Sequence, residues 1–124
     1  MSSGSANTAI FAERELDAVG RDGNALPPVV VRFGLPQRDP EPGGDWMCPV
    51  QILGIQEDDA INAYGVDAVQ AIQLAFQLAA IRLQSAPGRG ITLSWLGGSE
   101  LGFPLPDPAA ADFDFEDAEA DPAE

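Results

Sequence analysis

The sequence predicts a two-layer α+β domain in the order β-β-β-α-β-β, with one long helix packed on one face of a mostly antiparallel sheet. Residues 67–85 repeat apolar side chains with a helical period, and the flanking segments alternate apolar and polar side chains between glycine- and proline-rich turns. From residue 106 onward the chain holds eight acidic residues and no basic one, which predicts a disordered tail. We therefore expect a disordered N-terminus over residues 1–7, one domain over 8–105 and an acidic tail over 106–124.

Three strands are expected before the helix. Residues 8–19 alternate apolar and polar side chains, so that one face of this strand meets water. Residues 26–35 form the second strand, whose two prolines are confined to its start or to an edge of the sheet. Residues 46–55 form the third, and Pro49 indicates a bulge or an edge position there. The proline- and glycine-rich loop over 36–45 is too long for a tight hairpin, and such loops often carry function.

The helix has clear start and stop signals. An acidic connection over residues 57–59 and a short helical turn over 60–65 are expected to lead into it. Asp67 is a good N-cap, and Gln70 completes a capping-box pattern. The proline and glycine at 87–88 end the helix.

This helix is apolar on two sides. At about 100° per residue, one apolar face holds Val69, Ile72, Phe76, Ala79, Ala80 and Leu83. The opposite face holds Ala71, Leu74, Leu78 and Ile81. A helix on a sheet needs only one apolar face, so the second requires a cover. The cover could be the chain's own arm or tail, a partner protein, or a second copy in a homodimer. Simple exposure, which is common for scattered apolar residues, is the remaining alternative.

Two strands are expected after the helix. Residues 91–96 form the fourth strand and residues 100–105 a short fifth one. Between them, Gly97 and Gly98 have the composition of a two-residue hairpin turn.

Charge limits the classes of partner. The chain carries a net charge of −14, from 20 acidic residues and six arginines, with neither lysine nor histidine. Binding to nucleic acid or to an anionic membrane surface needs clustered positive charge, so we exclude both. The charge favours a basic protein partner, because complementary fields speed association. Solubility alone is the other explanation of the charge.

Few residues could carry chemistry. Without histidine, neither Cys48 nor any serine has the usual base, and the usual zinc sites are excluded. We therefore expect no catalytic residue, no metal and no cofactor, and we interpret Cys48 as a core residue. A single cysteine allows no internal disulfide, and no segment resembles a signal peptide or a membrane span. A soluble cytoplasmic protein is expected.

Aromatic and charged residues near glycine-rich turns and in the tail are the candidate partner-binding residues. Trp46 and Trp95 would serve as anchors, since tryptophan is frequent among binding hot spots. A place in the core is the alternative for both. The remaining candidates lie in the 36–45 loop and in the tail: Arg38, Asp39, Glu41, Asp45, Phe113 and Phe115.

Three segments carry a resemblance to a known family. They are GDWMCPVQILG at residues 44–54, AYGVDAVQAIQLAFQ at 63–77 and LSWLGGSELGFP at 93–104. Together they resemble an uncharacterised bacterial family, domain of unknown function 6968, over roughly residues 10–104 and not in the acidic tail. The resemblance implies a small single-domain bacterial protein and brings no catalytic residues.

Three hypotheses of function follow. The first is a non-enzymatic binding module, most concretely an inhibitor like an immunity protein that occludes a basic toxin or effector. The second is a structural or accessory protein that associates with itself through Leu74, Leu78 and Ile81. The third, for which nothing in the sequence argues specifically, is an enzyme that uses carboxylates.

Overall fold

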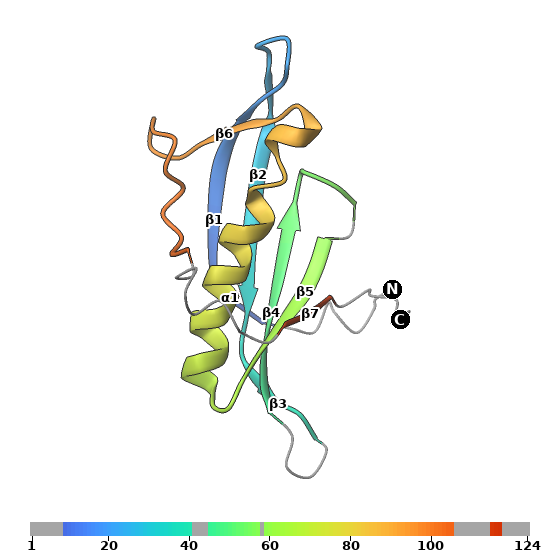
Figure 1. Ribbon diagram of the computed structural model, residues 1–124, viewed down its shortest axis with the longest axis vertical. Coiled ribbons are helices and arrows are strands. Elements are labelled where there is room, and N and C mark those ends of the chain that lie inside the picture. The colour runs from blue at the N-terminus through green and yellow to red at the C-terminus, as the bar shows by residue number, and fades with distance from the viewer. Residues whose placement is uncertain (1–8, 41–44, 58, 106–114, 118–124) are drawn as a thin grey trace.

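The computed structural model describes residues 9–40, 45–57, 59–105 and 115–117 (Figure 1). In chain order its elements are β1 (Ile10–Val19), β2 (Ala25–Gly34), β3 (Gln37–Arg38), β4 (Trp46–Leu53), β5 (Asp59–Gly65), α1 (Ala68–Leu83), the 3₁₀ turn η2 (Pro87–Arg89), β6 (Thr92–Ser94) and β7 (Phe115–Asp117). The sheet has the order β6-β1-β2-β4-β5-β7, with β3 paired to β4 off this path, and its pairings are antiparallel. The predicted two-layer α+β fold is confirmed.

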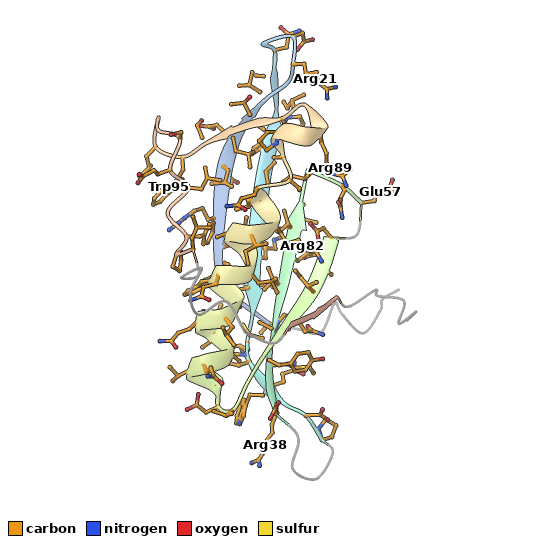
Figure 2. All side chains as sticks on the ribbon, in the orientation of Figure 1. Arg21, Arg38, Glu57, Arg82, Arg89 and Trp95 are labelled. Carbon is orange, nitrogen blue, oxygen red and sulfur yellow. The ribbon has the colours of Figure 1, made fainter. Side chains whose placement is uncertain are left out.

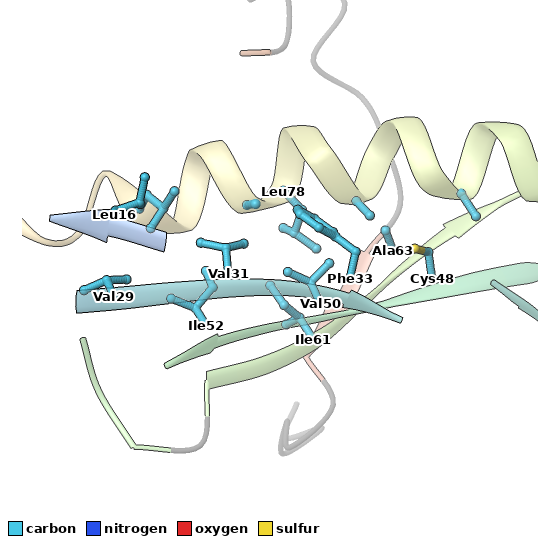
Figure 3. Close-up of a cluster of buried hydrophobic side chains, with 14 of the residues drawn as sticks. Leu16, Val29, Val31, Phe33, Cys48, Val50, Ile52, Ile61, Ala63 and Leu78 are labelled. Atoms are coloured by element: carbon cyan, nitrogen blue, oxygen red, sulfur yellow. The ribbon is translucent and has the colours of Figure 1, made fainter. Parts of the chain in front are cut away.

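The core lies between α1 and one face of the sheet, as Figure 3 shows. Because side chains alternate across a strand, every second residue of the central strands points toward the helix. Register then places Phe33 beside Val50, and Val50 beside Ile61, across three strands. The buried layer consists mainly of Leu16, Val29, Val31, Phe33, Cys48, Val50, Ile52, Ile61, Ala63 and Leu78.

The helix begins at the predicted cap. The carboxylate of Asp67 accepts a hydrogen bond from the backbone N–H of Gln70 at 2.8 Å. The Gln70 side chain accepts in return from the backbone N–H of Val66 at 2.7 Å, one residue before the cap. This exchange satisfies the N–H of Gln70, which the first turn of a helix leaves without a partner, and the N–H of Val66 just before the cap.

One face of α1 differs from the prediction. Leu78, which the sequence assigned to a second, exposed face, is only 1% exposed and points into the core (Figure 3). Ala71 is buried too, whereas Val69, assigned to the core face, is 62% exposed. The reason is that small residues, including Ala71, Ala75 and Ala79, face the sheet and let the helix lie close to it. The self-association face of Leu74, Leu78 and Ile81 is therefore wrong at Leu78, while Leu74 and Ile81 are half-buried.

Two further elements differ from the prediction. Residues 60–65, expected as a helical turn, belong to β5, in which buried and half-buried residues alternate and which pairs along its length with β4. Residues 100–105, expected as the fifth strand, form no strand. They run back beside β1, where Leu101 and Phe103 pack against the core.

The predicted hairpin turn lies one residue earlier. Trp95 and Gly98 form its closing pair through hydrogen bonds of 2.9 and 3.0 Å, so Leu96 and Gly97 occupy its centre. Both central residues have positive φ, 54° and 84°, which is the requirement of the mirror-image turns of tight hairpins.

Within the predicted acidic tail, residues 115–117 form β7, which pairs with β5. The rest of the tail and residues 1–7 lie outside the described residues. Within the described ranges, no helix is long and apolar enough to cross a membrane.

Candidate functional site

The sheet face opposite α1, which we call the outer face, carries a row of acids on β1. Glu13, Glu15 and Asp17 occupy alternate positions of this strand and are exposed. Their neighbours Leu16 and Ala18 point the other way and are buried. The alternation that builds the core thus also places three carboxylates on one surface.

Only one of these acids has a basic partner in the described part of the chain. Arg32 Nε lies 2.9 Å from a carboxylate oxygen of Glu13, and both side chains are 40–45% exposed. A surface pair of this kind contributes about 0–1 kcal/mol. Glu15 and Asp17 have no such partner within the described residues, so the outer face stays negative along β1.

Apolar side chains continue the outer face across the sheet. The register puts Glu15 beside Val30, and Val30 beside Leu53. Further along, Met47 pairs with Tyr64 on β5. These apolar residues are half-buried by their strand neighbours and are not among the described apolar residues that pack on the core. No described helix lies on this face, which therefore combines acidic and apolar groups on an ordered surface.

Arg14 is the one basic residue on the inner side of β1. Its guanidinium lies 3.8 Å from the centre of the Trp95 ring and 4.8 Å from that of Phe103. Arg14 Nη1 also donates a hydrogen bond to the carbonyl of Leu101 at 3.0 Å. Gly102, at φ 83°, leaves the space this contact needs, because an added Cβ would lie 2.5 Å from the Trp95 ring. The Arg14 contacts hold residues 95–103 against the sheet. Trp95, predicted as a partner-binding anchor, therefore has a structural role.

A groove runs between the last turns of α1 and residues 99–105. It encloses about 380 Å³, and a neighbouring hollow of about 260 Å³ continues it toward η2. Its lining is mainly apolar, with Ala80, Leu83, Leu101, Phe103 and Leu105. Small-molecule sites usually place a few polar groups so that they converge on the ligand. Here the polar lining residues, Gln84, Ser99 and Glu100, are all exposed.

A partly buried ion pair joins α1 to the start of β5. Arg82 Nη1 lies 2.9 Å from Asp59 Oδ1, and Asp59 is 4% exposed. A carboxylate this deeply buried needs a partner, because an unpaired buried charge is very costly. Asp59 therefore belongs to the framework, not to an acidic connection in solvent.

The predicted partner-binding residues fall into separate places. Arg38, Asp39, Asp45 and Trp46 lie together where β3 meets β4, with Arg38 paired to Trp46 and the Asp39 N–H donating to the Asp45 carbonyl at 2.9 Å. Trp95 lies far from them along the molecule (Figure 2). Both tryptophans are half-buried and pack against the core.

Of the tail candidates, Phe115 has its backbone in β7 and Phe113 lies outside the described residues. Glu41 of the 36–45 loop lies outside them too. Sequence reasoning did not propose Glu15 and Asp17, although their alternation with apolar residues was the available signal.

Cys48 is buried, as the sequence analysis expected, and its Sγ donates to the carbonyl of Gly34 at 3.3 Å. Burial raises the pKa of this thiol from its ordinary 9.0 to about 12. The thiolate is the reactive form, so the residue is a poor nucleophile. Among the described residues, no group of cysteine and acidic side chains is placed to hold a metal ion.

We expect a thiol reagent to label native Cys48 at pH 8 far more slowly than the chain in urea. The unfolded thiol ionises near pH 9.0 and the folded one only near 12. Ionisation of this thiol therefore leaves the free energy of unfolding unchanged below pH 9 and lowers it as the pH rises from 9 to 12. Labelling rates and urea unfolding between pH 7 and 11 measure both effects. Equal labelling of the native and unfolded chains would contradict the burial of the thiol.

Comparison with known proteins gives a family but no activity. A family model described as Domain of unknown function (DUF6968) matches residues 12–105, which is nearly the whole described domain. No curated protein and no solved structure matches the chain.

Proposed function

Since the chain belongs to the family Domain of unknown function (DUF6968), whose description names no activity, we propose its function from the geometry. In this proposal, the protein is a non-enzymatic binding module that holds a basic protein partner on the outer face of its sheet. The observation that carries this proposal is the row Glu13, Glu15 and Asp17 beside half-buried apolar side chains, with no described helix over it.

The charges and the surface support different parts of binding. A net charge of −14 attracts a basic protein at long range and raises the association rate. Specific affinity then needs apolar contact, which Val30 and Leu53 offer next to Glu15. Glu13 is partly neutralised by Arg32, so Glu15 and Asp17 are the acids that a partner's lysine or arginine would meet first.

The most concrete form of this function is that of an inhibitor, like an immunity protein, in the bacterial cytoplasm. It would act by covering a basic surface of a toxin or effector, and needs no chemistry of its own. The burial of Cys48 supports this form, because its thiol is withdrawn from solvent.

The test reverses the charge of the outer face. We expect the wild-type chain to capture a basic protein from its native source in stoichiometric amount, and the double variant Glu15→Lys/Asp17→Lys to bind that protein at least about tenfold more weakly, a loss of about 1.4 kcal/mol. The two affinities, measured with the purified partner at low and at high salt, should converge as salt rises.

The matched control is Glu57→Lys/Glu100→Lys, which makes the same change in net charge at two exposed acids outside the β1 row. We expect it to keep most of the affinity. Equal losses of affinity in the two double variants would show that the effect comes from net charge alone. They would rule out the outer face as the binding site.

A further inference from the structure

A short strand, β7, pairs with the outer edge of β5. Its three residues meet residues 61–63 in antiparallel register. A strand edge offers unpaired N–H and C=O groups to any extended chain, and proteins commonly cover such edges. β7 shows that this edge accepts a strand and in which direction.

Contacts with α1 fix the position of β5. Ile61 and Ala63 are buried under α1, and the Asp59 carboxylate is tied to Arg82 of that helix at 2.9 Å. The side chains that face the other way, Asn62 among them, are half-buried. A partner segment that pairs with β5 would therefore lose its own conformational entropy, whereas β5 is already ordered before binding.

Charge argues that β7 is a weak occupant of this edge. It belongs to a tail with eight acids, and the rest of the chain carries twelve acids against six arginines. Pairing therefore brings negative charge onto a negative body, over only three residues. A basic segment on the same edge would be attracted both by the body and by the tail it displaces.

We propose that the outer edge of β5 is the docking strand for an extended segment of the partner that is rich in lysine or arginine. β7 is an intramolecular placeholder that this segment displaces. The inference rests on the proposed function, in which the partner is basic, and adds the mode of attachment. The partner's strand pairs through its backbone, and its charges provide selectivity.

The experiment uses the full chain with the double substitution Phe115→Pro/Glu116→Pro. Neighbouring residues of a strand point their N–H groups to opposite sides, so one of the two prolines removes a bond to β5 in either register. The probe is a nine-residue peptide of alternating valine and lysine, and the readout is amide hydrogen exchange at residues 61–63. We expect the double variant to lose protection there, the peptide to restore it, and the peptide to bind the variant at least tenfold more tightly than the wild type.

Two control peptides test pairing and charge separately. One carries two prolines at its centre, and the other has glutamate in place of lysine. Neither should restore protection at residues 61–63. No protection by the lysine peptide, or equal protection by the glutamate peptide, would overturn the proposal. Because this readout needs no natural partner, its failure is distinguishable from failure of the outer-face capture experiment, which depends on Glu15 and Asp17.

Discussion

Replacing Leu78 with glutamate is expected to leave the chain unfolded at 25 °C. Leu78 is 1% exposed and lies between α1 and the strands that carry Val31 and Val50. The change removes a buried apolar side chain, worth about 1.5–3 kcal/mol, and introduces a carboxylate with no partner, which costs several kcal/mol more. The total approaches the 5–15 kcal/mol stability of a typical domain. Far-UV circular dichroism and urea unfolding measure the loss.

Val69→Glu is the matched control, since it makes a comparable change on the same helix at a residue that is 62% exposed. Its stability should stay within about 0.5 kcal/mol of the wild type. The pair also decides between two views of the helix. A folded Leu78→Glu chain that turned from oligomer to monomer would return Leu78 to the surface and revive the self-association hypothesis.

The sequence predicted the strands because their signals are local. Alternation over β1, β2 and β4 survives in the structure, and the capping residues Asp67 and Gln70 act where expected. Residues 60–65 were misassigned because six residues with alanine, asparagine and glycine have weak strand propensity. Their pairing with β4 and the cover of α1 make them a strand, and neither contact is visible locally.

The face of α1 that packs on the sheet could not be predicted from the sizes of its side chains. Large apolar residues defined the predicted faces, whereas the packed face is rich in alanine. The tight approach of α1 to β5 at Gly65 selects those small residues, and only the tertiary structure reveals it. The role of Arg14 was not predicted for a similar reason, because its aromatic partners Trp95 and Phe103 lie 81 and 89 residues further along the chain.

The candidate site was only partly predictable. The preference for a basic partner came from net charge and remains a proposal. Trp46 and Trp95 were predicted as partner-binding anchors from their residue type, and both pack against the core. The acid row on β1 is visible in the sequence as an alternation, but its place on a face without a described helix requires the sheet order.

Gly65→Ala is expected to destabilise the chain by about 3 kcal/mol, at the upper end for an added methyl group in a packed interior. A Cβ at this position would lie 2.5 Å from the backbone nitrogen of Ala71 and 2.9 Å from the carbonyl carbon of Gln70. Both atoms belong to the helix backbone, so no side-chain rotation relieves the contact. The start of α1 would have to move away from β5, which would also disturb the Asp67 cap.

Gly88→Ala isolates this effect, because it makes the same chemical change in η2, where an added Cβ meets nothing within 4 Å. Alanine there restricts the unfolded chain and should leave stability unchanged or raise it by up to about 1 kcal/mol. Urea unfolding of the two variants beside the wild type gives the comparison. Equal stability of Gly65→Ala and Gly88→Ala would mean that α1 and β5 are not in close contact. The alanine-rich face of α1 would then need another explanation, whereas a loss confined to Gly65→Ala makes close helix–strand approach its physical cause.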